Sequence, residues 1–115
     1  MQSVQSTNAM VALTHIIVGI VFVLVAYPLI QESVAPNDTY GIRIEETLSD
    51  DEVWYRVNKM GGYAMALAGF CTSFLGLLAW RKRKQWKPAK MGIITVGGML
   101  LFLTLFTTIA IQMAI

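Results

Sequence analysis

Three long stretches of this sequence contain no charged side chain: residues 10–30, 60–80 and 91–115. At 1.5 Å per residue, about 20 apolar residues span the hydrocarbon core of a bilayer, which is about 30 Å thick. Lipid offers the backbone no hydrogen bonds, so each stretch must pair its own peptide groups, as a helix does. The sequence therefore predicts an all-α integral membrane protein whose three transmembrane helices form a single domain.

The basic residues are concentrated in one of the two connections between these stretches. Residues 81–90 contain six lysines and arginines and no acid, whereas the longer connection, residues 31–59, contains three basic residues. Cytoplasmic loops carry the excess of positive charge. We therefore expect residues 81–90 and the N-terminus inside, and residues 31–59 and the C-terminus outside. No basic residue precedes the first stretch, as it would in a signal peptide, so we expect that stretch to be retained as a helix. The basic run suits contact with membrane lipids rather than with nucleic acid.

The longer connection contains all seven carboxylates of the chain and includes the pattern of a helix start. Ser49 followed by Glu52 is typical of a capping box, in which each side chain pairs with a free backbone amide. The sequence predicts a short amphipathic helix over residues 50–58, lying at the membrane interface. The glycines at residues 61–62 then allow either a bend or a continuous helix into the membrane.

Small residues form one face of the second predicted membrane helix, at alternating steps of four and three: Gly62, Ala66, Gly69, Ser73 and Gly76. In lipid, small side chains let two helix backbones approach closely. We therefore expect this face to pack on another helix, either in this chain or in a second copy. Gly92, Gly97 and Gly98 in the third helix are candidates for the opposing surface.

Few polar side chains lie within the predicted helices. His15 is either a neutral, hydrogen-bonded packing residue or a functional group that binds a partner or a quinone-like ligand. Thr104, Thr108 and Gln112 follow one another at four-residue steps. Such a stripe either lines a conduction path or bonds backbone carbonyls and neighbouring helices. Cys71 is the single cysteine, and we expect it to act as a small packing residue.

No set of residues has the pattern of a catalytic or metal centre. The acids of the longer connection are accompanied by no histidine, no cysteine and no metal-ligand spacing. The acids at residues 50–52 are sufficiently explained by the start of a helix, whose dipole favours negative charge there. We therefore expect a protein that is not an enzyme and that uses no cofactor and no metal.

One pattern in the longer connection is more specific. It reads Asn37-x-x-x-Gly41-Ile42-Arg43-x-x-x-Thr47-Leu48-x-Asp50-x-x-Val53-Trp54-x-x-x-Asn58 and is followed by a membrane helix. This string resembles the SdpI immunity-protein family. Ile44 departs from the resemblance, because the family usually has threonine at that point. The eponymous members are also longer, with additional helices before the motif, so this chain resembles a short, three-helix member.

The resemblance implies a bacterial inner-membrane protein of the immunity type. The family is known for protecting bacteria against a secreted, membrane-active peptide toxin, and for signalling by sequestering a repressor at the membrane. The hydropathy of the longer members tends to place the motif on the cytoplasmic side, whereas the charge bias of this chain places it outside.

Within the motif, Arg43 has two alternative roles. It can make bidentate contacts with a carboxylate or a lipid phosphate, or it can bond Asp50 or a backbone carbonyl and so hold the loop over the helices. Trp54 is either an interfacial anchor or a ligand platform. Gly41 permits a tight approach or a positive φ. We expect loop-fixing hydrogen bonds from the remaining polar residues of the motif, Asn37, Thr47 and Asn58.

Three functions fit these observations. The leading hypothesis is recognition of a peptide, toxin or protein partner through residues 37–58, for immunity or signalling. The second is an accessory or scaffold subunit of a larger membrane complex, docked through the small-residue face of the second helix. The third is a small transporter formed by homo-oligomerisation around the third helix.

Overall fold

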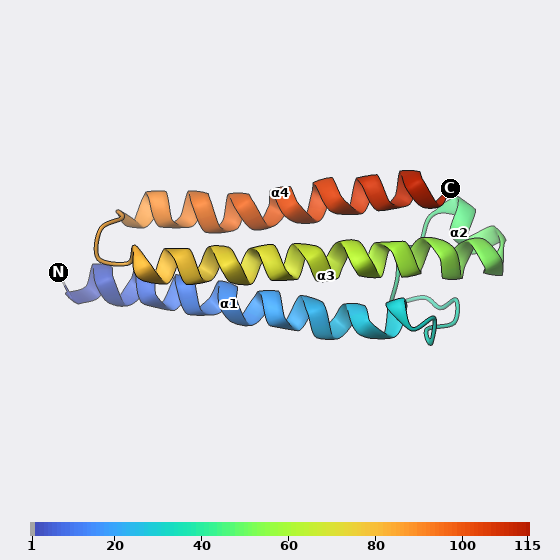
Figure 1. Cartoon of the computed structure of the whole chain (residues 1–115), viewed down its shortest axis with the longest axis horizontal. Helices are drawn as coiled ribbons and strands as arrows, with labels where there is room; N and C mark the ends of the chain where they lie inside the picture. The colour runs from blue at the N-terminus through green and yellow to red at the C-terminus, as the bar shows by residue number, and fades with distance from the viewer. Residues whose placement is uncertain (1) are drawn as a thin grey trace.

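The computed structural model describes residues 2–115, which contain no strand and four helices: α1 (Gln2–Ile30), α2 (Glu45–Ser49), α3 (Asp51–Arg81) and α4 (Pro88–Ala114). Successive long helices run antiparallel, and α3 lies between α1 and α4 (Figure 1). Each long helix is apolar enough to cross a membrane, which confirms the prediction of three such helices. The bundle is 55 Å long, so it extends beyond a hydrocarbon core of about 30 Å.

The long helices begin before the predicted membrane spans do. α1 starts at Gln2 and includes several polar residues ahead of the predicted membrane span. α4 starts at Pro88, where the fixed φ of proline suits a helix and its missing N–H would have had no helical partner. Each predicted span therefore covers only part of its helix.

The predicted helix over residues 50–58 is helical from Asp51 onward, but it is continuous with the second membrane helix. These residues form the first turns of α3, which continues through Gly61 and Gly62 into the membrane span. Both glycines are packing positions: a Cβ on Gly61 would clash with the side chain of Ile42, and one on Gly62 would lie 2.9 Å from the side chain of Ile30. The separate short helix is α2, which ends just before α3 begins.

Asp50, and not Ser49, caps the N-terminus of α3. The Asp50 Oδ1 accepts hydrogen bonds from the amides of Glu52, at 2.8 Å, and Val53, at 3.3 Å. Ser49 belongs to α2, and its hydroxyl donates to the carbonyl of Glu46 at 3.3 Å. The predicted N-cap is therefore shifted by one residue, because the turn before it is itself helical, and Val53 at the third helical position has no polar side chain with which to complete a capping box.

The small-residue face of α3 packs against α1. A Cβ on Gly69 would lie 2.5 Å from the carbonyl oxygen of Gly19, and a Cβ on Gly76 would lie 2.8 Å from the backbone nitrogen of Ile16. The Ser73 hydroxyl donates to the carbonyl of Ile16 at 2.8 Å. Without larger side chains between them, the two helix backbones lie in van der Waals contact, as expected for small residues in lipid.

α4 packs differently and does not oppose the small-residue face. A Cβ on Gly92 or Gly97 would meet nothing within 4 Å, whereas one on Gly98 would meet the side chain of Leu75. Bulky side chains such as Leu75 stand between α3 and α4, so the glycines of α4 are not needed for close backbone contact. Since α1 covers the small-residue face, that face is not free to dock a separate subunit.

An asparagine in α1 holds the turn between α3 and α4. The Asn8 amide nitrogen donates to the carbonyls of Arg83, at 3.0 Å, and Trp86, at 2.8 Å. The Arg83 guanidinium lies 4.1 Å from the Trp80 ring centroid, and the Lys90 ammonium lies 5.3 Å from that of Trp86. The basic turn is therefore attached to α1 as well as to the two helices that it joins.

Candidate functional site: the cap formed by residues 31–50

Residues 31–50 fold over the end of the bundle opposite the basic turn, and we call this segment the cap. Its first turn is built by Asn37. The Asn37 Oδ1 accepts from the amides of Thr39, at 2.8 Å, and Tyr40, at 2.6 Å. Its amide nitrogen donates to the carbonyls of Ala35, at 2.7 Å, and Tyr40, at 2.9 Å. One side chain thus closes the turn from both sides, as asparagine can.

Asn58 on α3 fastens the middle of the cap. Its Oδ1 accepts from the Ile42 amide at 2.5 Å, and its amide nitrogen donates to the Trp54 carbonyl at 3.0 Å. The backbone approaches this closely because Gly41 has a φ of +120° and no side chain. A Cβ on Gly41 would lie 2.8 Å from the Asn58 Oδ1 and 3.0 Å from the Trp54 ring. This position therefore requires glycine on both conformational and steric grounds.

Trp54 is the centre of the cap and is not an interfacial anchor. Its side chain is 0% exposed, and its Nε1 donates to the Val34 carbonyl at 2.8 Å. The two alternatives drawn from the sequence, an interfacial anchor and a ligand platform, both need an exposed indole, whereas here the cap closes over the ring and supplies the hydrogen-bond partner that water would otherwise provide.

Thr47 fixes the backbone that leads into α2 by hydrogen bonds. Its buried Oγ1 accepts from the Ile44 amide at 3.0 Å. The hydroxyl can donate to the carbonyl of Ile42, at 2.9 Å, or of Ile44, at 3.0 Å. The chain between Ile42 and α2 is therefore fixed by one buried hydroxyl.

Tyr40 attaches the cap to α1. Its phenol donates a hydrogen bond to the carbonyl of Val25. Burial raises the pKa of the Tyr40 phenol above its ordinary value of 10.0, since desolvation disfavours the charged phenolate. The phenol therefore keeps its proton, and remains a donor, throughout the physiological pH range.

Arg43 is the basic side chain of the motif, and it is exposed. Its Nη2 lies 3.6 Å from the Asp38 Oδ1, and the two side chains are 40% and 98% exposed. An exposed pair of this kind contributes little to stability. Of the alternatives drawn from the sequence, a bond from Arg43 to Asp50 is not formed, since Arg43 pairs with Asp38 and the Asp50 Oδ1 caps α3. The guanidinium is therefore presented to the surroundings and not committed to the fold.

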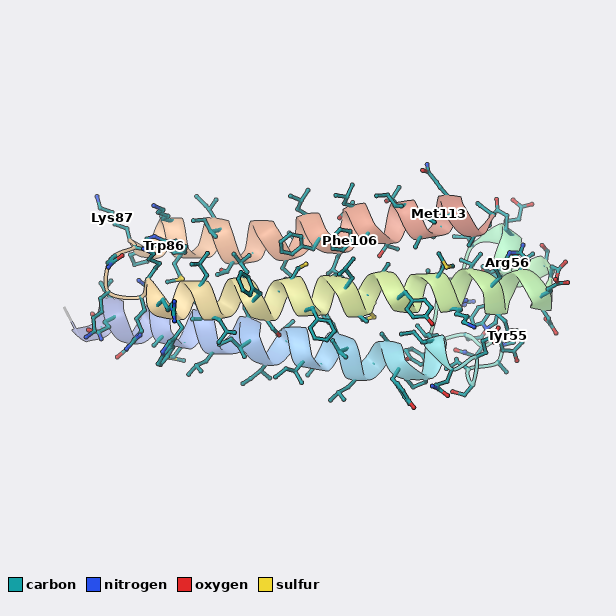
Figure 2. The ribbon with its side chains drawn as sticks, viewed as in Figure 1. Tyr55, Arg56, Trp86, Lys87, Phe106 and Met113 are labelled. Atoms are coloured by element: carbon teal, nitrogen blue, oxygen red, sulfur yellow. The ribbon has the colours of Figure 1, made fainter. Side chains whose placement is uncertain are left out.

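Arg56 attaches the end of α4 to the same end of the molecule. Its Nε donates to the Ala114 carbonyl at 2.7 Å, and its Nη1 lies 3.9 Å from the Glu52 Oε1. A cation at the C-terminus of a helix is favoured by the helix dipole. Figure 2 shows Arg56 beside the end of α4, and Trp86 and Lys87 at the opposite end of the bundle.

The two ends of the molecule differ strongly in charge. Residues 31–59 contain seven carboxylates and three basic side chains, a net charge of −4, whereas residues 81–90 contain six basic side chains. The cap end also has an open hollow of about 490 Å³, lined by Glu32, Glu52, Tyr55 and Arg56. The surface of the cap end therefore attracts positive charge, although Arg43 on this surface is itself positively charged.

The polar residues predicted within the membrane do not converge. His15 is buried, with its Nδ1 2.8 Å from the Val11 carbonyl oxygen. Thr104, Thr108 and Gln112 are exposed along α4. Cys71 on α3 is half-buried, and so is Ala66, the remaining member of the small-residue face. Within residues 2–115, no three histidine, cysteine or acidic residues lie close enough together to hold a metal ion.

Several residues that build the site were not singled out from the sequence. Tyr40 and Arg56 bond carbonyls that are distant in the chain, which no local pattern reveals. Ile42 belongs to the motif, but it acts through its backbone, so its side-chain type says little about its role.

The model of the SdpI/YfhL protein family matches residues 33–114, which include α3, α4 and all but the first two residues of the cap. The curated proteins and the solved structures contain no match. The family match covers well over half of the chain and includes every residue of the motif. The chain therefore belongs to the SdpI/YfhL protein family.

Proposed function

We propose that this protein is a non-enzymatic recognition protein of a bacterial inner membrane, which binds a peptide, toxin or protein partner through its cap. The observation that carries the proposal is that the polar side chains of the motif have two different roles. Asn37, Thr47 and Asn58 use their polar atoms to fix the cap, whereas Arg43 projects from it. A surface that is ordered before binding loses less conformational entropy when a partner docks.

The charges of the cap end indicate the chemistry of the partner. A net charge of −4 over residues 31–59 attracts a basic peptide and raises its rate of encounter. Arg43 in turn suits a carboxylate of that partner, with which it can form two parallel hydrogen bonds. A basic, membrane-active peptide with a free carboxylate satisfies both requirements, and protection or signalling would follow from its capture.

Arg43→Ala tests this proposal. We expect a partner captured from native membranes by the tagged wild-type protein to be lost from the variant by at least about tenfold, because a bidentate pair contributes more than 1.4 kcal/mol to binding. The readout is quantitative mass spectrometry of co-purified peptides and proteins. Lys84→Ala, which removes a positive charge at the opposite end, is the matched control and should keep the partner. If Arg43→Ala captured as much partner as Lys84→Ala, the cap would be rejected as the binding surface.

The proposal places the cap outside the cell and the basic turn inside, on the basis of the charge difference between the two connections. In a Cys71→Ser background, a cysteine introduced at Thr39 should react with a membrane-impermeant maleimide added to intact cells. A cysteine at Lys84 should react only after the cells are lysed. The reverse pattern would place the cap in the cytoplasm and redirect the proposal toward an intracellular partner.

A further inference from the structure

A crevice lies beneath the cap, between the three long helices. It has a volume of about 340 Å³, and the segment of residues 40–42 forms its roof. Its walls come in pairs from α1, α3 and α4: Val25, Leu29, Gly61, Met65, Leu103 and Thr107. The Thr107 hydroxyl is the one polar side-chain group in these walls. The crevice exists because α1 and α4 make few contacts with each other, and the roof residue Ile42 packs against Gly61.

The position of the crevice in the membrane determines what can reach it. All six wall residues lie within the charge-free stretches, near the ends that face the cap. In a membrane the crevice therefore lies at the depth of the hydrocarbon, close to its boundary with water. An apolar cavity of this kind does not hold stable water, whereas acyl chains surround it at high concentration.

We propose that the crevice binds one acyl chain of a bilayer phospholipid, whose phosphate lies against Arg43. Its volume is at the lower end of the range for ligand pockets, about 300–1,000 Å³, which suits a single chain rather than a folded peptide segment. Arg43 directly follows the roof residue Ile42, and its exposed pairing with Asp38 is easily exchanged for a phosphate. A guanidinium matches phosphate geometry through two N–H groups.

Lipid binding and partner recognition share Arg43, but lipid binding in the crevice does not depend on the proposed function. Arg43 cannot hold a lipid phosphate and a partner's carboxylate at once, so lipid and partner compete for the same guanidinium. The crevice itself would bind lipid even if the cap had no partner. A variant that fills the crevice and leaves Arg43 in place therefore separates the two ideas.

The experiment uses the full chain in vesicles containing a phospholipid with a photoactivatable diazirine in its acyl chain. After illumination, mass spectrometry measures the adducts formed on Met65 and neighbouring crevice residues. Thr107→Phe places a ring in the crevice and should reduce these adducts by about tenfold, a loss of about 1.4 kcal/mol of binding. Thr108→Phe adds the same ring at the next residue, which is exposed on α4, and should leave the adducts at the wild-type level.

Two further comparisons complete the test. Leu103→Trp, with Leu101→Trp at an exposed position as its control, repeats the experiment if Thr107→Phe fails to fold. A diacylglycerol probe that lacks phosphate should label the wild-type crevice less than the phospholipid does, and Arg43→Ala should remove that difference. Equal labelling of the crevice-filling and control variants would mean that the adducts come from the general lipid shell and would overturn the proposal. Loss of partner capture in Thr107→Phe with unchanged lipid labelling would assign the crevice to the partner instead.

Discussion

Replacing Trp54 by alanine is expected to open the cap while leaving the three long helices in the membrane. The indole is fully buried, and its Nε1 bonds Val34. Truncating a buried tryptophan typically costs about 3–5 kcal/mol. The indole also lies beside Gly41, and the Trp54 carbonyl accepts a hydrogen bond from the Asn58 amide. The loss of stability should therefore be concentrated in residues 31–50. Limited proteolysis of reconstituted protein should cut this segment much faster than in the wild type.

Two variants define the cause of that effect. Trp54→Phe keeps most of the ring but loses the bond to the Val34 carbonyl, and should cost about 1–3 kcal/mol for the unpaired polar group. Tyr27→Ala truncates an aromatic residue that is exposed near the end of α1, and should leave the cap resistant to protease. If Trp54→Ala digested no faster than Tyr27→Ala, the indole would not be the centre of the cap.

Gly69→Leu is expected to separate α1 from α3. A Cβ alone would lie 2.5 Å from the Gly19 carbonyl oxygen and 2.9 Å from the Phe22 side chain, so the whole leucine cannot be accommodated without moving the helices apart. Overpacking usually costs about 1–3 kcal/mol, and we expect the upper end or more here because backbone, and not a flexible side chain, is in the way. The thermal unfolding midpoint in detergent should fall accordingly.

Gly97→Leu is the matched control, with the same substitution on α4. Nothing lies within 4 Å of the Cβ that it would add, so the bundle should unfold at the wild-type temperature. An equal fall for both variants would show that glycine matters for helix flexibility in general. An effect limited to Gly69→Leu would identify close backbone contact with α1 as the cause.

The membrane helices could be predicted because their signal is collective. No single residue determines that 60–80 crosses the bilayer, and the prediction depends on an uninterrupted run without charge, which the backbone in lipid can satisfy only as a helix. The partner of each helix face was not predictable in this way. The spacing of Gly62, Gly69 and Gly76 indicated close packing, but α1 and α4 offered equally apolar surfaces, and only the three-dimensional arrangement distinguishes them.

The roles of the motif residues were harder to predict because short-range chemistry does not reveal long-range burial. Trp54 near a membrane boundary has the composition of an interfacial anchor, and only the closure of the cap makes it a core residue. From the sequence, Asp50 could pair with Arg43, but in the structure its carboxylate caps α3. Most of the motif thus specifies how the cap is built, which explains how a recognisable pattern can leave the binding partner unspecified.

The bond from Asn8 to the basic turn has a consequence for how the protein enters the membrane. α1 contains no lysine or arginine, so it carries no positive charge that would retain one of its ends in the cytoplasm. The basic turn follows α3 in the chain, and Asn8 reaches the Arg83 and Trp86 carbonyls only once that turn exists. α1 is therefore joined to the basic turn only after α3 has been synthesised, so this contact forms late in the assembly of the bundle.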